Sequence, residues 1–499
     1  MDGAAVMRNV IKKAYVLISL AALPLLTGCG ASNGSGRAVT DSDFFESKID
    51  GEINISVYDS MLYKNFLKEA ARAFENKYPG AKVNIETFSV MPEIKTMEVD
   101  GKFISVMQSS DESQTRSDYI NRVNTRIMSG EGADIYAMDF LPLNKLINSS
   151  ALENLDNYMT LDPDFNKNDY RENILEALRF RGGIWLLPIN YSFNYFSYDS
   201  TLIPLHAALN FGADRAFNTE KLINLGIPFF DGSRLLFNYT GGLGSMFDLL
   251  LNENFHSFVD FNTGRANFIN GGFASMLESI NYFTDHGYIR RNAVSAMDIE
   301  ELMQRAMEAP AERVFFKLNN SYFLINMFIR ELTQEMNTGF SGSIVAAIED
   351  DDKISGIQAN ADGKVPFSYN LGFGINSSSK NRETAWAFIK FLLSKEMQLS
   401  PYIFNLPLNN EARNEKIQFD FKMAIGMYDE ELNNRQLQAM ENYTSALESL
   451  SGLIDTYIIQ DTNINDMIMQ ETQYFLTGTR TAEEVTKALQ NKADLYLSE

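Results

Sequence analysis

Residues Gly182–Asp199 read Gly-Gly-Ile-Trp-Leu-Leu-Pro-Ile-Asn-Tyr-Ser-Phe-Asn-Tyr-Phe-Ser-Tyr-Asp, and this stretch decides the expected architecture. After the glycine pair and the proline, aromatic residues alternate with small polar ones, which fits a β-strand better than a helix. Asn190, Ser192 and Asn194 stand among so much aromatic surface that the backbone suits a buried strand lining a cleft. We therefore predict that this segment crosses between two lobes, with a ligand held where it crosses.

The length and charge of the chain limit the number of domains and the kinds of partner to be expected. With 499 residues it is too long for one ordinary hydrophobic core, so two or three domain-sized units are expected. Its 43 Lys and Arg residues face 65 Asp and Glu residues, a formal net charge of -22. That acidic balance argues against a nucleic-acid backbone as a partner.

The N-terminus has the pattern of a targeting segment. Three basic residues lie between positions 8 and 13, and Ala14–Leu26 is an apolar run of 13 residues. A membrane-spanning helix needs about 20 residues, so this run predicts a signal peptide over 1–28. Both Met1 and Met7 fit as the start, because the first six residues add nothing to the pattern.

A cysteine follows the apolar run directly. Leu26-Thr-Gly-Cys29 resembles the lipobox of bacterial lipoproteins, in which the cysteine is lipidated and becomes the first residue. Cys29 is also the only cysteine, so no intramolecular disulfide is expected. Residues 29–44 include a Gly/Ser/Asn-rich part and predict a flexible tether. The globular part is then expected outside the cytoplasmic membrane, anchored to the outer face of that membrane by lipid alone. The alternative is an unmodified cysteine at a cleavage site.

The first globular segment has the pattern of a βαβ unit. Ile53–Val57 alternates apolar and polar residues, Met61–Tyr78 has helical spacing, and Val83–Thr87 alternates again. Two strands joined by a helix over such a length predict parallel pairing with a right-handed crossover. The loop Tyr58–Ser60 would then lie at the carboxyl end of the first strand, where open α/β sheets bind ligands.

Other elements follow from the same patterns. Met91–Ser117 predicts a hairpin or loop insertion, Ile135–Met138 a strand that ends just before Asp139, and Glu349–Gly363, with its three consecutive aspartates, a surface loop. Further strands are expected at Arg234–Asn238, Arg313–Leu318 and Tyr369–Ile375, and further helices at Phe273–His286, from Tyr322 to about Met336, and at Gln436–Leu450, Asn463–Leu476 and Ala482–Leu497.

Several segments, taken in order, carry a resemblance to a known family. They are Ala73–Val83, Ser129–Ile135, Gly183–Pro188, Tyr198–Asp199, Ser379–Leu393, Leu406–Pro407 and Leu476–Gly478. Together with the lipobox, they resemble the extracellular solute-binding proteins (family 1) of ABC importers, the type that includes maltose-binding protein. The resemblance covers essentially the whole chain after the signal peptide.

This resemblance implies a fold and a function. The fold would be a two-lobed α/β, periplasmic-binding-protein-like fold (type II), with lobes joined by a multi-strand hinge. By position, the first lobe would hold 45–192 plus 366–408, and the second 193–365 plus 409–499. A monomer would capture a sugar or oligosaccharide between its lobes and deliver it to the permease subunits of an ABC transporter.

A sugar needs flat aromatic faces and planar amides or carboxylates for its hydroxyls, so the candidates are such residues just past strand ends. Ser192 stands where a carboxylate is expected in this family, and Tyr322 corresponds in order to an aromatic residue that stacks on sugar there. The predicted ligand-binding residues are Tyr58, Asp59, Asp139, Phe140, Asn190, Tyr191, Ser192, Tyr239, Thr240, Asn320 and Tyr322.

Structural roles compete with these assignments. Tyr191 fits the interlobe core as well as the cleft. Asp59 and Asn320 each stand where they would cap a following helix. Trp185 and Trp386 have apolar neighbours, which favours the core over the cleft.

Catalysis and metal binding find little support in the sequence. The three histidines lie far apart, at positions 206, 256 and 286, and neither a zinc-protease motif nor a nucleophile elbow is present. Asp162–Asn168 has the alternate oxygen-bearing side chains of a calcium loop but lacks its glycine and its final glutamate, so a solvated loop is expected instead. No cofactor, metal or catalytic residue is predicted. The rival hypotheses are a surface glycosidase using a carboxylate pair, and a receptor for a peptide or another polar solute.

Overall fold

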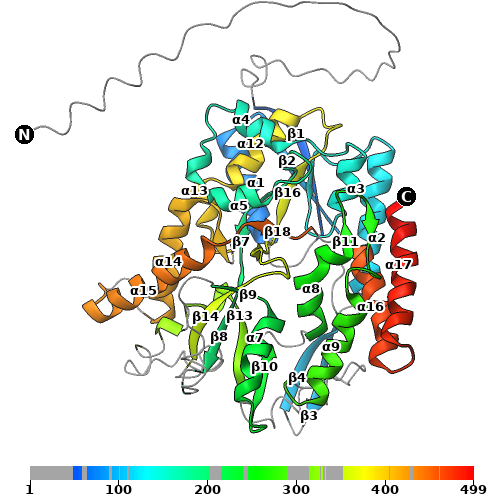
Figure 1. The fold of residues 1–499 in the computed structure, drawn as a ribbon. Coiled ribbons are helices and arrows are strands. Elements are labelled where there is room, and N and C mark those ends of the chain that lie inside the picture. The colour runs from blue at the N-terminus through cyan, green and yellow to red at the C-terminus, as the bar shows by residue number, and fades with distance from the viewer. Residues whose placement is uncertain are drawn as a thin grey trace, which may run out of the picture. The chain divides into compact units, whose positions relative to one another are not determined.

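The protein is represented by a computed structural model (Figure 1). It describes residues 49–58, 64–88, 93–99, 102–108, 112–199, 201, 215–239, 246–289, 314–325, 327–329, 332, 352–403, 405–426, 431–459 and 461–498. The predicted signal peptide, Cys29 and the tether lie outside these residues. Residues 45–499 form one compact unit, to which the following description applies.

A five-stranded mixed sheet is built from the first part of the chain and one later strand. Its order is β2 (Ala81–Phe88), β1 (Gly51–Tyr58), β5 (Ile135–Ala137), β16 (Gly372–Ile375) and β6 (Leu187–Pro188). The first three strands run parallel, and β16 pairs antiparallel with both β5 and β6. The strand β16 therefore returns to this sheet after an excursion of more than 180 residues from β6.

The predicted βαβ unit is confirmed within this sheet. Ile53 and Ile55 are fully buried, and they pair in parallel register with Val83 and Ile85. Between the two strands, α1 (Lys64–Lys77) buries one stripe of apolar side chains, which includes Phe74. Because the strands alternate and the helix is amphipathic, both elements bury their apolar faces in one core.

A second five-stranded mixed sheet follows in the chain. Its order is β10 (Leu235–Tyr239), β13 (Val314–Asn320), β8 (Asn194–Asp199), β14 (Asp352–Gln358) and β9 (Ala216–Phe217). Here β8 lies in the middle and pairs antiparallel with both β13 and β14. The aromatic stretch of the sequence thus enters this sheet as its central strand, and Tyr195 and Phe196 are fully buried.

The expectation of a surface loop over Glu349–Gly363 is wrong. Residues Asp352–Gln358 form β14, in which Ile357 is fully buried. A bulge shifts the register between Ile354 and Gly356, so the strand lacks a regular alternation of apolar and polar residues. Three consecutive aspartates, of which Asp352 opens the strand, are also typical of a loop. The sequence pattern therefore does not indicate a strand here.

Short ladders join the segments that cross between the two sheets. The strand β7 (Asn190–Tyr191) lies between β6 of the first sheet and β8 of the second, and it pairs with β17 (Leu406–Pro407). The strand β15 (Pro366–Phe367) pairs with β18 (Thr456–Tyr457). A multi-strand connection between two α/β sheets is what the predicted type II fold requires.

The two remaining ladders are hairpins. They are β3 (Glu93–Val99) with β4 (Lys102–Gln108), and β11 (Val259–Asp260) with β12 (Arg265–Ala266). The first agrees with the hairpin or loop insertion predicted for Met91–Ser117.

Helices surround both sheets. Besides α1, they are α2 (Glu112–Met128), α3 (Leu143–Asn148), α4 (Leu155–Leu161), α5 (Glu172–Ala177), α7 (Thr219–Gly226), α8 (Met246–Phe258), α9 (Phe273–Asp285), α12 (Arg382–Leu392), α13 (Lys395–Gln398), α14 (Asn410–Ala424), α15 (Asn434–Ser451), α16 (Thr462–Leu476) and α17 (Ala482–Ser498). Short 3-10 turns are η1 (Lys167–Asp169), η2 (Ile227–Phe229) and η3 (Ser321–Phe323). None of the helices in the described ranges is long and apolar enough to cross a membrane.

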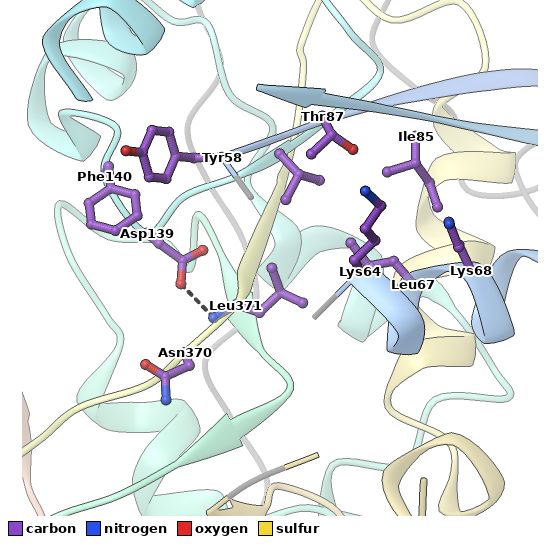
Figure 2. Close-up of a pocket in the computed structure, with 11 residues that line it drawn as sticks. Tyr58, Lys64, Leu67, Lys68, Ile85, Thr87, Asp139, Phe140, Asn370 and Leu371 are labelled. Carbon is purple, nitrogen blue, oxygen red and sulfur yellow. Dashed lines mark hydrogen bonds between the residues drawn. The ribbon is translucent and has the colours of Figure 1, made fainter. Parts of the chain in front are cut away.

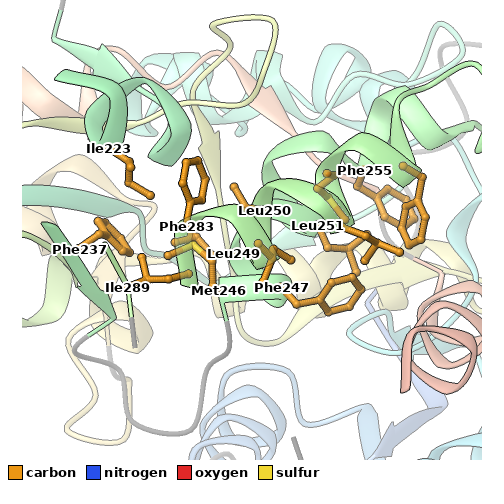
Figure 3. Close-up of a cluster of buried hydrophobic side chains, with 14 of the residues drawn as sticks. Ile223, Phe237, Met246, Phe247, Leu249, Leu250, Leu251, Phe255, Phe283 and Ile289 are labelled. Atoms are coloured by element: carbon orange, nitrogen blue, oxygen red, sulfur yellow. The ribbon is translucent and has the colours of Figure 1, made fainter. Parts of the chain in front are cut away.

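The second sheet shares its core with helices from two distant parts of the chain. Figure 3 shows Phe237 of β10 beside Ile223 of α7 and side chains of α8 such as Leu249. The same cluster contains residues of α16 and α17, among them the fully buried Leu489. In Figure 1, α17 lies beside α16 and α9. The C-terminal helices therefore complete this core, although the predicted lobe boundaries stay a prediction.

The segment Asp162–Asn168 is only partly the solvated loop that the sequence suggests. Most of it is exposed, but Asp162 is 4% exposed. Its Oδ2 accepts hydrogen bonds from Nε1 of Trp386 at 2.8 Å and from Nζ of Lys390 at 2.6 Å. The carboxylate thus anchors the loop to α12, and Trp386 belongs to the core, as expected.

Candidate ligand-binding cleft

A cavity of about 520 Å³ lies between the two sheets, in the part of the chain that the structure describes. This volume falls in the range of about 300–1,000 Å³ that is typical of small-molecule sites. Its polar and charged lining residues are Arg116, Asp139, Asn194, Asp248, Asn252, Gln358, Ser368, Tyr369, Tyr457, Thr462, Asn465 and Asp466. Its apolar lining residues are Met138, Phe140, Leu141, Leu143, Phe193, Leu249, Leu251, Leu318, Pro366, Phe367, Ile458 and Met469.

The cavity collects residues from strand ends and crossing segments. Asp139 and Phe140 follow β5 of the first sheet, while Asn194 opens β8 and Gln358 ends β14 of the second. Residues 366–369 belong to the segment that returns from the second sheet to the first. A ligand in this cavity would touch both sheets and the connection between them.

Asp139 places a carboxyl group on the first-sheet wall. Its Oδ1 accepts a hydrogen bond from the backbone N–H of Leu371 at 2.5 Å (Figure 2). Leu371 has a left-handed backbone, with φ of 64°, just before β16. The side chain of Asp139 opens into the cavity, but the surrounding protein desolvates it and raises its pKa to about 6. At neutral pH, this group is mostly an ionised hydrogen-bond acceptor.

Two tyrosines form an aromatic surface in the lining of the cavity: Tyr369, which follows β15, and Tyr457 of β18. The rings of Tyr369 and Tyr457 lie 5.4 Å apart between centroids, and the Tyr457 hydroxyl donates to the Tyr369 hydroxyl at 3.3 Å. Burial raises the pKa of Tyr369 well above its ordinary value and that of Tyr457 to about 12. Both phenols are therefore neutral, and they offer flat faces together with hydroxyl groups.

Arg116 adds a positive charge from α2. Its guanidinium carbon lies 5.7 Å from the centroid of the Phe140 ring. Its Nε is buried and has no hydrogen-bond partner among the described residues. A buried donor without a partner is unusual and costs stability unless another group, such as a ligand or water, accepts its hydrogen bond.

A smaller cavity of about 140 Å³ adjoins the cleft and shares Asp139 and Phe140 with it. Tyr58 lies at the end of β1, and its ring meets the Phe140 ring edge-on, 5.0 Å between centroids. Figure 2 shows Lys64 and Lys68 on α1 at the opposite side of this cavity. The carboxyl end of the first sheet is therefore hollow, as the strand order predicts.

The structure brings together only some of the predicted ligand-binding residues. Asp139 and Phe140 line the main cavity, and Tyr58 joins them in the smaller one. Tyr239 ends β10, and its side chain is not among those described. Asp59 and Thr240 lie outside the described residues.

The candidates in the crossover do not line the cavity. Asn190 and Tyr191 are fully buried. Asn190 accepts a hydrogen bond from the backbone N–H of Asn370 at 3.0 Å, and the Tyr191 hydroxyl lies 3.5 Å from the guanidinium of Arg413. Ser192 is 6% exposed, and its backbone pairs with Ser368. The side chains of Asn190 and Tyr191 and the backbone of Ser192 thus hold the crossing segments together.

Two candidates at the end of β13, Asn320 and Tyr322, do not line the cavity either. Asn320 caps η3 by accepting the backbone N–H of Tyr322 at 3.1 Å, and it also donates to Asn194 at 3.2 Å. Tyr322 is 49% exposed and does not line the cavity.

Sequence reasoning missed most of the second-sheet wall. Thr462, Asn465, Asp466 and Met469 lie at spacings of three and four residues, so they occupy one face of α16 that borders the cavity. The apolar stripe with Ile464 and Ile468 occupies another face of this helix. The polar stripe on α16, beside its apolar stripe, is the sequence signal that could have indicated these lining residues. On α8, Asp248 and Asn252 lie four residues apart and both line the cavity, so this helix carries a shorter signal of the same kind. For β14 no comparable pattern exists.

Within the described ranges, no cluster of three or more His, Cys, Asp or Glu side chains is suited to hold a metal ion. The described cleft instead offers neutral aromatic hydroxyls, side-chain amides and carboxylates beside aromatic and aliphatic surface. Such a lining can bind a polar molecule through hydrogen bonds and stacking.

Comparison with solved structures decides the fold. An extracellular solute-binding protein, family 1, from Alicyclobacillus acidocaldarius matches with a TM-score of 0.54 at 12% identity, over 91% of this chain and 100% of that one. The chain has the fold of extracellular solute-binding proteins. The two-lobed, type II periplasmic-binding-protein-like fold expected from the sequence is therefore confirmed.

Two further structures with the solute-binding fold agree. A putative oligosaccharide periplasmic-binding protein from Synechococcus matches with a TM-score of 0.53 at 13% identity, over 89% of this chain and 99% of that one. An ABC substrate-binding protein from Listeria monocytogenes, solved in complex with cycloalternan, matches with a TM-score of 0.50 at 14% identity, over 90% and 99%. No protein-family model matches the sequence, and no curated protein matches it either.

Proposed function

We propose that this protein is the substrate-binding protein of an ABC transporter and that it captures a sugar or oligosaccharide in the cleft between its two sheets. The observation that carries the proposal is the cavity of about 520 Å³, lined from both sheets and from the segments that connect them. A ligand bound there would bridge both walls, so binding would favour a closed arrangement over an open one.

The lining favours a neutral, hydroxylated ligand. Tyr369 and Tyr457 supply flat aromatic surface and hydroxyl groups, and Asn194 and Gln358 supply planar amides. A sugar presents apolar C–H faces and hydroxyls that both donate and accept, which such a lining can match. The cycloalternan complex of the Listeria protein of similar fold makes a glucan oligosaccharide a reasonable first ligand to test.

The membrane context rests on the N-terminal sequence. A signal peptide over residues 1–28 would direct the chain out of the cytoplasm, and lipid on Cys29 would hold it at the outer face of the membrane. From there it would deliver its ligand to permease subunits.

A glycan array probed with the folded full-length chain tests the sugar proposal. We expect binding to a restricted set of oligosaccharides, with cycloalternan and linear α-glucans as the first probes. An absence of binding to any sugar, by a chain whose folding is confirmed by circular dichroism, would reject the proposal.

An enzymatic role is the alternative, because Asp139, Asp248 and Asp466 all line the cleft and glycosidases act through paired carboxyl groups. The oligosaccharides recovered after incubation with the protein distinguish the two roles. A receptor returns its ligand intact, whereas sustained release of shorter sugars would favour the enzyme.

A further inference from the structure

A chain of hydrogen bonds links a buried carboxyl group to the wall of the cleft. Glu253 on α8 is 3% exposed, and its Oε1 accepts a hydrogen bond from Nε2 of Gln358 at 2.9 Å. Oε1 of Gln358 accepts in turn from Nδ2 of Asn194 at 2.8 Å. Gln358 and Asn194 line the cleft, so Glu253 reaches the ligand site through the amide groups of other residues.

The same chain continues beyond Asn194 to the backbone. Oδ1 of Asn194 accepts from Nδ2 of Asn320 at 3.2 Å, and Oδ1 of Asn320 accepts from the backbone N–H of Tyr322 at 3.1 Å. An ionised carboxylate can only accept, and a backbone N–H can only donate. The two ends therefore fix the direction of all three amides. If one amide turned over, two donors or two acceptors would face each other.

The surroundings of Glu253 suit its ionised form. Besides Gln358, the backbone N–H of Thr219 donates to the carboxylate at 3.0 Å and the Thr219 hydroxyl at 2.8 Å. These groups lie on α7 and β14, so two elements besides α8 supply donors to the carboxyl group. Every hydrogen-bond partner of the carboxylate within the described residues is thus a donor, and a proton on the carboxylate would face one of these donors.

Burial opposes this ionisation. It raises the pKa of Glu253 to about 7, and the nearby charge of Glu220 on α7 acts in the same direction. The segment after β14 also approaches α8, because the backbone N–H of Ala361 donates to the carbonyl oxygen of Glu253 at 3.0 Å. Asp362 in this segment pairs with His256 on α8, with 2.7 Å between Oδ2 and Nε2. Because Glu253 titrates near neutrality, its protonation state can change under ordinary conditions.

We propose that Glu253 is a positioning residue of the ligand-binding cleft, which holds the Gln358 and Asn194 amides in the one orientation that the ligand requires. The inference rests on the proposed function, because it concerns the same cleft. Each of the two amides keeps a second N–H and a second oxygen lone pair for a ligand hydroxyl. Protonation of Glu253 removes the negative charge to which Gln358 and Thr219 donate and turns one of its two oxygens into a donor, so its hold on the orientation of the row is weakened.

The ligand test compares Glu253→Gln with the wild type over pH values on both sides of 7. For an oligosaccharide that binds the wild type, we expect calorimetry to give a Kd that rises about tenfold as the pH falls below 7, which corresponds to about 1.4 kcal/mol. Glu253→Gln is expected to bind more weakly than the wild type and to lack the part of the pH dependence that has its midpoint near pH 7. If the variant kept the wild-type Kd and pH profile, the positioning role would be overturned.

Two variants control this test. Glu471 on α16 is also a buried carboxylate, at 4% exposure, but it pairs with Arg480 and Lys492 rather than with the amide row. Glu471→Gln is therefore expected to keep the wild-type pH profile of Kd. Asp139 also titrates near this range and lines the cleft, so the Kd of Asp139→Asn is measured over the same pH values. Only a pH dependence that persists in Asp139→Asn and disappears in Glu253→Gln is assigned to Glu253.

A readout without ligand separates this inference from the proposed function. In the full chain labelled with ¹⁵N at Asn and Gln side chains, we expect the Gln358 amide resonance to shift with a midpoint near pH 7, and to lose this shift in Glu253→Gln. No such titration would overturn the positioning role, even if a sugar binds. If no sugar binds but the titration is seen, only the proposed function fails.

An exchange variant covers the case that Glu253→Gln does not fold. In Glu253→Gln/Gln358→Glu, the new Gln can accept from Thr219 and donate to the new Glu, which can still accept from Asn194. We expect urea unfolding to show this double variant to be more stable than either single variant. A double variant no more stable than the single ones would contradict a row of fixed direction.

Discussion

Ser192 and Ser368 exchange two backbone hydrogen bonds, each 2.8 Å long, and so join the two segments that cross between the sheets. Ser192 lies between β7 and β8, and Ser368 lies between β15 and β16. The cleft is lined directly beside this junction, by Phe193, Phe367 and Tyr369. The geometry of the ligand site thus depends on how these two segments are held together.

Removal of one of these hydrogen bonds is expected to destabilise the protein. Ser368→Pro loses the N–H that donates to Ser192, and we expect the free energy of unfolding to fall by about 1–3 kcal/mol. Ser368→Ala keeps the backbone group and removes only an exposed side chain, so a change within about 0.5 kcal/mol is expected. Urea unfolding measures both. Equal stability of the two variants would show that the junction contributes nothing.

Gly356 in β14 is expected to tolerate no side chain. A Cβ at this position would lie 2.2 Å from the backbone oxygen of Arg215, so β9 would have to move. We expect Gly356→Ala to lower the free energy of unfolding by about 1–3 kcal/mol.

Its neighbour supplies the control for this measurement. The buried hydroxyl of Ser355 has no hydrogen-bond partner among the described residues. Ser355→Ala is therefore expected to be neutral or slightly stabilising in the same unfolding experiment. A Gly356→Ala variant as stable as Ser355→Ala would contradict the close approach of β9 and β14.

Asp139 is expected to make stability depend on pH. Its pKa of about 6 in the folded protein lies above the ordinary value of 3.8, so the folded state binds the proton more tightly than the unfolded state. The stabilisation is complete below the unfolded pKa and is lost as the pH rises through about 6. Relative to the wild type, Asp139→Asn should therefore gain stability between pH 4 and pH 6 and then stay level. A difference that does not change over this range in urea unfolding would exclude the shifted pKa.

Cys29 is expected to carry lipid. In cells that are supplied with labelled palmitate, the wild-type chain should take up label and sediment with membranes, whereas Cys29→Ala should do neither. An exported wild-type chain without label would contradict the lipoprotein assignment.

The first sheet follows well from the sequence because its patterns are local. Ile53, Ile55 and Val57 alternate along β1 and are buried on one face, and α1 has the matching apolar stripe. The end of β5 also places Asp139 at the cleft, as the rule for the carboxyl ends of parallel strands predicts.

The second wall of the cleft depends on tertiary packing that the sequence does not encode locally. A bulge interrupts the pattern of β14, so the sequence predicts a surface loop over the residues that include Gln358. Glu253 has the local pattern of an ordinary helical residue, and only the fold brings it to Gln358, more than a hundred residues away. Conversely, Asn190 and Tyr191 are residue types that are typical of a sugar site, but they pair with β17 and are fully buried in the core.

A structure of the full chain with an oligosaccharide bound tests the central claim most directly. The account predicts a sugar in the cleft, in contact with Tyr369 or Tyr457 on one side and with Asn194 or Gln358 on the other. A sugar that binds elsewhere on the protein and leaves these four residues untouched would contradict it.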